Sequence, residues 1–242
     1  MNDHNRKPYR LERRPDEQDP RPPSSNQDRI KKLDTGKTGT TAAVTSKVKI
    51  GKQRWKIMKD TLTVGTWNVQ TLWATGKLEL LRNEMKRFRF NVIGISEVRW
   101  TGKGETSCGD FIWSGEETTH NRGVGMLLNA RAKQTLIGYN PISSRVITAR
   151  FNTTPFKLTV IHVYAPPSAS SDDEIEIFYD SIEHALTQTP KKDIVIVTGD
   201  WNAKVGSDNT NWELVMGKYG YGDRNERGDR LLEQLQATST NC

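Results

Sequence analysis

Apolar positions beyond about residue 61 follow two patterns that alternate along the chain. Short runs rich in β-branched residues predict strands. These runs cover 61–69, 92–96, 111–114, 123–128, 146–151, 158–164 and 193–199. Helical spacing of apolar residues predicts helices over 77–90 and 171–186, and 228–235 resembles the opening of another. Paired strands with helices between some of them predict an α/β fold, a two-sheet sandwich flanked by helices.

The first sixty residues lack this periodicity. Residues 1–61 contain 16 Lys and Arg against 8 Asp and Glu, which leaves a net charge of +8 there and −1 in the rest. Composition therefore predicts a disordered basic arm over 1–60 and a folded domain over 61–242. A basic arm attracts nucleic acid, DNA above all, through counterion release. A merely solubilising leader is an equally good interpretation of the same charge.

Cysteine usage and hydropathy exclude several classes of protein. Cys108 and Cys242 are the only cysteines, too few for a disulfide framework. No apolar segment follows the N-terminal charges, and no run approaches the ~18 apolar residues of a membrane span. We therefore expect an intracellular protein, nuclear or cytoplasmic, that is neither secreted nor bound to a membrane. No protein partner can be inferred.

Polar residues stand at the ends of four predicted strands. They are Asn68, Glu97, Tyr164, and the pair Asp200 and Asn202. Each alone is ordinary turn chemistry. Residues 200 and 202 lie two apart after a strand, so an extended backbone would point both side chains to one side.

Glu97 and Asn68 offer the oxygen ligands that suit a hard cation. Mg²⁺ keeps several waters and commonly uses one or two protein carboxylates, so this pair predicts a magnesium site, with Mn²⁺ as a possible substitute. The sequence shows no His/Cys cluster of the kind that binds zinc.

Five motifs occur in a familiar order: GTWN, ISE, RGVGMLL, HVYAPP and GDWNAKVG. Together they resemble the endonuclease/exonuclease/phosphatase superfamily over about 62–235. The stretches GTWNVQTL, SEVRWTG and HVYAPP look most like the endonucleases of LINE (RTE-type) retrotransposons and host proteins of the craniofacial development protein 2 type. The resemblance implies a metal-dependent phosphodiesterase of endonuclease type that acts on DNA.

The resemblance also implies a role for each polar residue at a strand end. Glu97 would bind the metal, and Asn68 would complete or order that site. Tyr164 would touch the scissile phosphate, and Asp200 would position or deprotonate the attacking water. Asn202 would donate a hydrogen bond to a phosphate oxygen.

Three further residues are candidates for nucleic-acid contact. Arg99 and Trp100 follow Glu97, and a cation beside an aromatic ring suits that role, although a solvated Arg with a packed Trp fits equally well. Asn225 resembles, loosely, a position where the superfamily places an active-site Asn or Asp. Trp67 and Trp201 adjoin the candidate catalytic residues, but strand alternation favours core packing for both.

One part of the superfamily pattern is missing. The family ends in a strand that carries Ser-Asp-His, preceded by another active-site Asp. None of the four histidines, at positions 4, 120, 162 and 184, follows an aspartate near the C-terminus. We therefore expect a domain truncated at its C-terminus, without its last strands, and weak or inactive as an enzyme. A noncatalytic nucleic-acid-binding retrotransposon remnant, or a phosphatase of small or lipid phosphate esters on the same fold, remain alternatives.

Overall fold

The computed structural model describes residues 55–56 and 61–240. Nearly all of the expected basic arm thus lies outside the described residues. The strands form a five-stranded sheet, a four-stranded sheet and a small parallel pair. The five-stranded sheet has the order β2 (Val64–Asn68), β3 (Val92–Ser96), β6 (Val124–Leu128), β5 (Phe111–Ser114) and β4 (Lys103–Glu105). The four-stranded sheet has the order β11 (Ile194–Asp200), β10 (Leu158–Tyr164), β8 (Val146–Phe151) and β7 (Leu136–Ser143). The small pair consists of β1 (Trp55–Lys56) and β9 (Thr153–Thr154).

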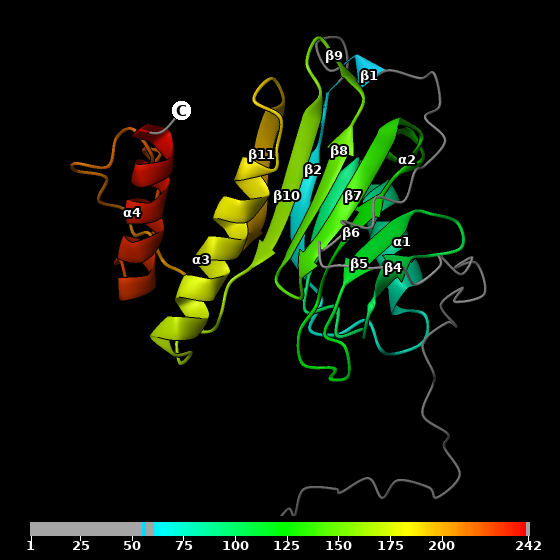
Figure 1. Cartoon of the computed structure of the whole chain (residues 1–242), viewed down its shortest axis with the longest axis horizontal. Helices are drawn as coiled ribbons and strands as arrows, with labels where there is room; N and C mark the ends of the chain where they lie inside the picture. Colours follow the sequence, from blue (N-terminus) through cyan, green and yellow to red (C-terminus); the bar gives the residue numbers. More distant parts are fainter. Residues whose placement is uncertain (1–54, 57–60, 241–242) are drawn as a thin grey trace, which may run out of the picture.

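The two large sheets pack face to face, and helices cover their outer faces (Figure 1). Helix α1 (Lys77–Arg87) and the short α2 (Ala130–Thr135) lie on the side of the five-stranded sheet. On the other side, α3 (Asp172–Thr187) packs against the four-stranded sheet, and α4 (Glu226–Thr240) lies beyond it. This architecture confirms the predicted α/β sandwich flanked by helices.

Strand alternation sorts the apolar side chains into three clusters. The central cluster fills the space between the sheets and includes Val92, Met126 and Val160. The other two lie under α1 and under α3. Successive residues of β3 and β10 therefore serve different cores, which explains why both strands read as continuous apolar runs.

The folded region begins earlier than the composition indicated. Trp55 is buried in the central cluster and pairs through β1 with Thr153. The boundary expected near residue 60 is therefore wrong for Trp55 and Lys56. A two-residue strand carries too little periodicity to be recognised in a basic segment.

Two of the predicted helices end at residues other than those that the sequence pattern indicated. Helix α1 ends at Arg87, and Phe88 is half exposed although it continues the helical spacing. Helix α4 continues through Thr240, beyond the stretch 228–235 in which the spacing indicated its opening. Strands β4 and β7 and helix α2 were not predicted, because β4 and α2 are short and bulges at 136–138 and 141–143 interrupt β7.

Strands β2 and β11 form the outer edges of their sheets, and neither has a neighbour on its free side within the described residues. Val195 and Val197 of β11 are both more than one third exposed. Trp67 of β2 is 38% exposed, so its expected core packing is wrong, because no strand covers the edge beside it. Trp201, by contrast, packs against Phe178 of α3, as expected.

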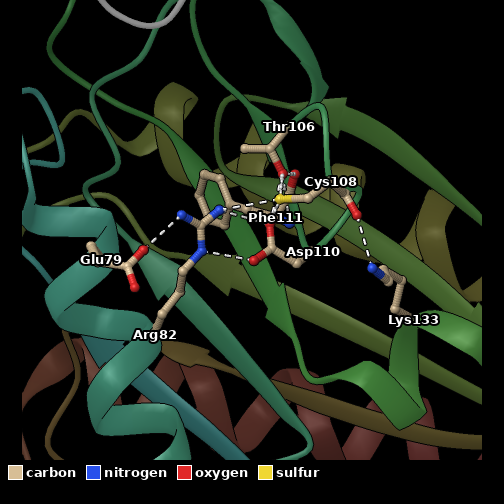
Figure 2. Close-up of polar contacts among 7 residues, drawn as sticks. All are labelled: Glu79, Arg82, Thr106, Cys108, Asp110, Phe111 and Lys133. Atoms are coloured by element: carbon tan, nitrogen blue, oxygen red, sulfur yellow. Dashed lines mark hydrogen bonds and ion pairs between the residues drawn. The ribbon is translucent and has the colours of Figure 1, made fainter.

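An ion pair joins α1 to the beginning of β5 (Figure 2). The Arg82 guanidinium donates two hydrogen bonds to Asp110, at 2.7 and 2.9 Å. Thr106 and the Cys108 thiol donate to the same carboxylate, and Lys133 of α2 donates to the Cys108 carbonyl. Although burial favours the neutral acid, these donors hold the pKa of Asp110 well below its usual value. The cluster therefore fixes both helices to the five-stranded sheet.

Replacing Asp110 with asparagine should lower the free energy of unfolding by ~1–3 kcal/mol, because the half-buried Arg82 loses the more buried of its two charged partners, Asp110 and Glu79. Urea denaturation at pH 7 would measure the loss. The same measurement on wild type should show the Asp110 contribution intact above about pH 4 and fading as pH falls further, the direction for a depressed carboxyl pKa. Glu84→Gln is the control, since its contact with Arg87 is 3.6 Å long and exposed. Equal losses in both variants would contradict the argument.

Candidate active site

The candidate residues lie at the ends of four strands. Asn68, Tyr164 and Asp200 are the last residues of β2, β10 and β11, and Glu97 directly follows β3. Strands β2 and β3 are parallel, as are β10 and β11, with Tyr164 directly opposite Asp200 in the register. The two sheets therefore deliver these side chains to one end of the sandwich.

Asn68 connects the two sheets at this end. Its amide nitrogen donates to Glu97 Oε1 at 2.8 Å and to Asp200 Oδ2 at 2.9 Å. Its carbonyl oxygen accepts from the Gln70 backbone N–H at 2.9 Å. Because all three contacts agree with one orientation of the amide, both of its hydrogens are committed to carboxylates.

Glu97 receives donors on both of its oxygens. Arg99 Nη2 lies 2.8 Å from Oε2, and the Tyr164 phenol lies close enough to this carboxylate to help lower its pKa. Burial raises the pKa of Glu97, but the hydrogen bonds from Asn68 and Arg99 outweigh it, and the pKa lies below its usual value. Burial and the Glu97 charge raise the pKa of Tyr164. Glu97 is therefore held as a carboxylate and Tyr164 as a neutral phenol at neutral pH.

Asn202 occupies a different geometry from the one expected. Strand β11 ends at Asp200, and Asn202 has a left-handed backbone with φ of 46°, so the extended-chain argument for residues 200 and 202 is wrong. The Asn202 side chain donates to the Ala165 carbonyl at 2.8 Å, and its backbone N–H lies 3.3 Å from Asp200 Oδ1. The turn still keeps Asn202 beside Asp200.

Left-handed backbone conformations cluster around these residues. Gln70, Glu97, Arg99 and Asn202 all have φ between 46° and 59°, a region that non-glycine residues rarely adopt. Such conformations cost free energy and collect where function demands a particular side-chain position. Their clustering supports this end of the sandwich as a functional site.

The two residues considered for nucleic-acid contact in the loop after Glu97 differ in burial. The Arg99 side chain is 43% exposed, although its Nε is buried. Trp100 is 5% exposed, packs against Phe111 and Trp113, and donates its indole N–H to the Leu72 carbonyl. A role for Trp100 in base stacking is therefore wrong, and the packed alternative holds.

Asn225 lies at the start of α4. Its side-chain oxygen accepts from the backbone N–H groups of Lys204 and Gly228, each at 2.9 Å. It thus caps the helix and fixes the loop that follows β11. No contact of Asn225 with Glu97 or Asp200 is seen.

His162 is fully buried between the sheets, two residues before Tyr164. Its Nε2 lies 3.2 Å from the Ser96 hydroxyl, and a Cβ atom on Gly94 would meet its Nδ1 at 2.0 Å. Burial lowers the pKa of His162 from 6.5 to about 3. The ring is therefore neutral and occupies core volume beneath the site.

Arg145 was missed by the sequence reasoning. It precedes β8 and contacts the backbone and the ring of Tyr164. An arginine in a turn before a strand carries no local motif, so no signal in the sequence distinguishes it.

The donors present can be compared with what metal ions require. The described residues contain no group of three or more His, Cys, Asp and Glu side chains placed to share a metal. Glu97 and Asp200, linked through one amide, do match the one or two carboxylates that Mg²⁺ needs beside its waters. The Asn68 amide nitrogen faces Glu97, so in this arrangement Asn68 orders the carboxylate instead of offering it a ligand oxygen.

A two-sheet α/β sandwich with carboxylates and amides at one end of its strands defines the class of protein. The chain belongs to the Endonuclease/Exonuclease/phosphatase family, whose model matches residues 65–235. The predicted membership is thereby confirmed.

Individual relatives agree with this assignment. Craniofacial development protein 2 of Bos taurus is 39% identical over 184 residues, which are 75% of this chain and 31% of that protein. The chain thus spans about a third of the length of the curated relatives it matches.

One solved structure shows the same fold at low identity, and a second is similar over a comparable share of the chain. An AP endonuclease from Archaeoglobus fulgidus is 14% identical with a TM-score of 0.50, covering 73% of this chain and 70% of that one. The endonuclease domain of TRAS1, a telomere-specific non-LTR retrotransposon, is 18% identical with a TM-score of 0.49, covering 71% of this chain and 70% of that one.

Between residues 61 and 240, no helix has the length and apolar character needed to cross a membrane.

The buried His162 predicts a specific pH dependence of stability. Because its folded pKa of about 3 lies below its usual value of 6.5, unfolding takes up a proton below pH 6.5, and stability falls as the pH drops toward 3. Between pH 6.5 and 5 this loss amounts to ~1–2 kcal/mol. Denaturant titrations of His162→Asn should lack this part of the slope.

The control for this prediction is His184→Asn, on the exposed side of α3. Its pH profile should match that of the wild type. A His162→Asn variant that folds and keeps the full wild-type slope would show that His162 is not the responsible group.

Proposed function

We propose that this chain provides the site of a metal-dependent phosphodiesterase that acts on DNA. The observation that carries the proposal is the Asn68 amide, which joins the carboxylates of Glu97 and Asp200 from opposite sheets. Bringing two like charges together costs free energy unless donors or a cation compensate. Such an arrangement suits a cation and a phosphate better than it suits a purely structural role.

Glu97 is the residue best placed to bind Mg²⁺, and Mn²⁺ is a reasonable substitute. Its pKa stays low, so the carboxylate is charged at neutral pH, and its surroundings are partly open. A bound divalent cation would neutralise charge on the phosphate and on the leaving oxygen. Arg99 Nη2, 2.8 Å from Glu97 Oε2, would have to leave that oxygen or share it.

The remaining residues have complementary roles in the proposed hydrolysis. Asp200 would accept a proton from the attacking water, because its carboxylate faces the space beside Asn68. The Tyr164 phenol would donate to a phosphate oxygen, which its raised pKa permits. Asn202 would turn its amide from the Ala165 carbonyl to the phosphate.

We expect slow turnover from the described residues alone. His162 lies in the core, and His120 Nδ1 donates to the Arg99 carbonyl while its ring packs on Trp73. Thus no histidine between residues 61 and 240 contacts Asp200 or Tyr164 in the structure. Loss of one preorganised group at the reacting centre typically costs ~10²–10³-fold in rate.

DNA is the proposed substrate for two reasons. The related structures are named as an AP endonuclease and as the endonuclease domain of a retrotransposon. The N-terminal arm also carries an excess of positive charge that favours a polyanion. A phosphatase acting on small phosphate esters would gain little from such an arm.

The free edges of β2 and β11 support an incomplete sandwich. Val195, Val197 and Trp67 leave apolar surface in contact with water, which is unusual for strands that flank a candidate site. We propose that further strands complete both sheets in the active protein. These strands would also supply groups that the described site lacks.

Glu97→Gln should reduce nicking of supercoiled plasmid by ~10²–10³-fold in magnesium, because the site loses its principal metal ligand. It should also weaken Mn²⁺ binding, measured as free Mn²⁺ by electron paramagnetic resonance. Glu183→Gln makes the same charge change on the exposed face of α3 and should leave both readouts unchanged. Equal Mn²⁺ affinity in wild type and Glu97→Gln would refute the metal assignment.

Removing residues 1–54 should weaken DNA binding and flatten its dependence on salt, because fewer counterions are released. This deletion spares the buried Trp55. The segment holds 14 basic and 7 acidic residues, so a full-length variant with its seven lysines changed to glutamine has an arm of zero net charge. Fluorescence anisotropy across a salt series should give similar slopes for both altered proteins. A wild-type slope in either would contradict the role of the arm.

A further inference from the structure

Arg145 lies behind Tyr164 with its side chain only 8% exposed. It precedes β8, and its Nη1 donates to the Tyr164 carbonyl at 3.2 Å. The Tyr164 N–H donates in return to the Arg145 carbonyl at 2.9 Å. The guanidinium carbon also lies 5.2 Å from the centre of the Tyr164 ring, within the range of a cation–π contact. One residue thus holds both the backbone and the ring of Tyr164.

The guanidinium is itself anchored from the opposite side. Glu174, in the first turn of α3, accepts from Arg145 Nη2 at 2.8 Å and from Arg122 Nη2 at 2.7 Å. Arg122 in turn lies 3.5 Å from Glu116. Two arginines and two glutamates therefore link the loop between β5 and β6 to α3 and to the back of Tyr164. Their net charge is zero, which allows Arg145 to remain charged although it is buried.

A purely structural tie between α3 and β8 explains this arrangement less well. A buried ion pair is often replaceable by apolar residues without loss of stability, so packing alone does not call for a charge here. Arg145 Nε is also buried without a hydrogen-bond partner. One donor of the guanidinium, Nε, thus has no hydrogen-bond partner. The contacts that the guanidinium does make converge on Tyr164, the residue that reaches Glu97.

We propose that Arg145 is a positioning residue, which holds the Tyr164 phenol against Glu97 and keeps a positive charge behind the ring. The catalytic consequence rests on the proposed function, in which the phenol donates to the scissile phosphate. The effect of Arg145 on the position of the ring does not, because it depends only on the contacts with the backbone and the ring of Tyr164.

The test compares Arg145→Met and Arg145→Lys with the wild type. Tyrosine is replaced throughout by 3-fluorotyrosine, and the Tyr164 signal in the ¹⁹F NMR spectrum is assigned with Tyr164→Phe. At pH 7 the shift and width of that signal report the position and mobility of the ring. Arg145→Met should move and broaden the Tyr164 signal, and Arg145→Lys should do so less. In plasmid nicking, Arg145→Met should lower kcat by ~10–10²-fold and leave KM within about twofold, because the buried Arg145 side chain would not touch DNA.

Arg150→Met is the matched control. Arg150 makes an equally well-formed pair with Asp193, at 2.6 and 2.9 Å, on the same four-stranded sheet. Its loss should lower stability without moving the Tyr164 signal. If Arg145→Met does not fold, Glu174→Gln releases the guanidinium from its outer anchor, and a shifted Tyr164 signal in that variant supports the proposal.

The proposal is overturned if a folded Arg145→Met keeps the wild-type Tyr164 signal, or if Arg150→Met changes the signal equally. Its failure is distinct from failure of the proposed function. A wild-type chain that hydrolyses no DNA, but whose Tyr164 signal responds to Arg145 alone, keeps the positioning role and loses the enzymatic one.

Discussion

Two carboxylates from different sheets share one carboxamide, and the rest of the structure is arranged so that they meet. Glu97 and Asp200 are far apart in the chain, and Asn68 reaches both with its two amide hydrogens. This requires β2, β3, β10 and β11 to end at one level, which the parallel registers of both pairs provide. It also requires a close approach of the sheets just below the site, where Gly94 leaves room for His162. A shift of one residue in either register would move a carboxylate to the opposite face of its sheet.

The interior strands of this fold could be predicted from the sequence, whereas its shortest strands and the ends of its helices could not. Strands β3 and β10 are buried on both faces and show mainly apolar runs, so their limits agree with the prediction. The limits of β8 agree as well, although its partly exposed residues alternate with buried ones. At the margins, periodicity carries little information. Trp55 contributes to the core from a two-residue strand, and Phe88 keeps a helical spacing after its helix has ended. These outcomes depend on tertiary neighbours that no local pattern encodes.

The members of the candidate site could be named from the order of their motifs, but their orientations could not. Asn68, Glu97, Tyr164 and Asp200 do lie together. The left-handed turn at Asn202, the burial of Trp100 and the capping role of Asn225 depend on backbone geometry and packing that residue identity leaves open. Arg145 shows the converse difficulty. Its contacts with Tyr164 come from a turn about twenty residues earlier, and an arginine there has no distinguishing spacing.

The left-handed backbones around the site have a consequence for how such a chain evolves. Outside glycine and asparagine, each residue in this conformation costs on the order of 1–2 kcal/mol, and Gln70, Glu97 and Arg99 all adopt it. Glycine at these three positions would relieve the strain, so selection for stability alone would favour it. A chain freed from any functional demand would therefore drift toward a more stable domain with no carboxylate at position 97. Selection for thermostability and retention of the site therefore act in opposite directions here. Ancestral or laboratory variants selected only for stability should lose the residues of the site first.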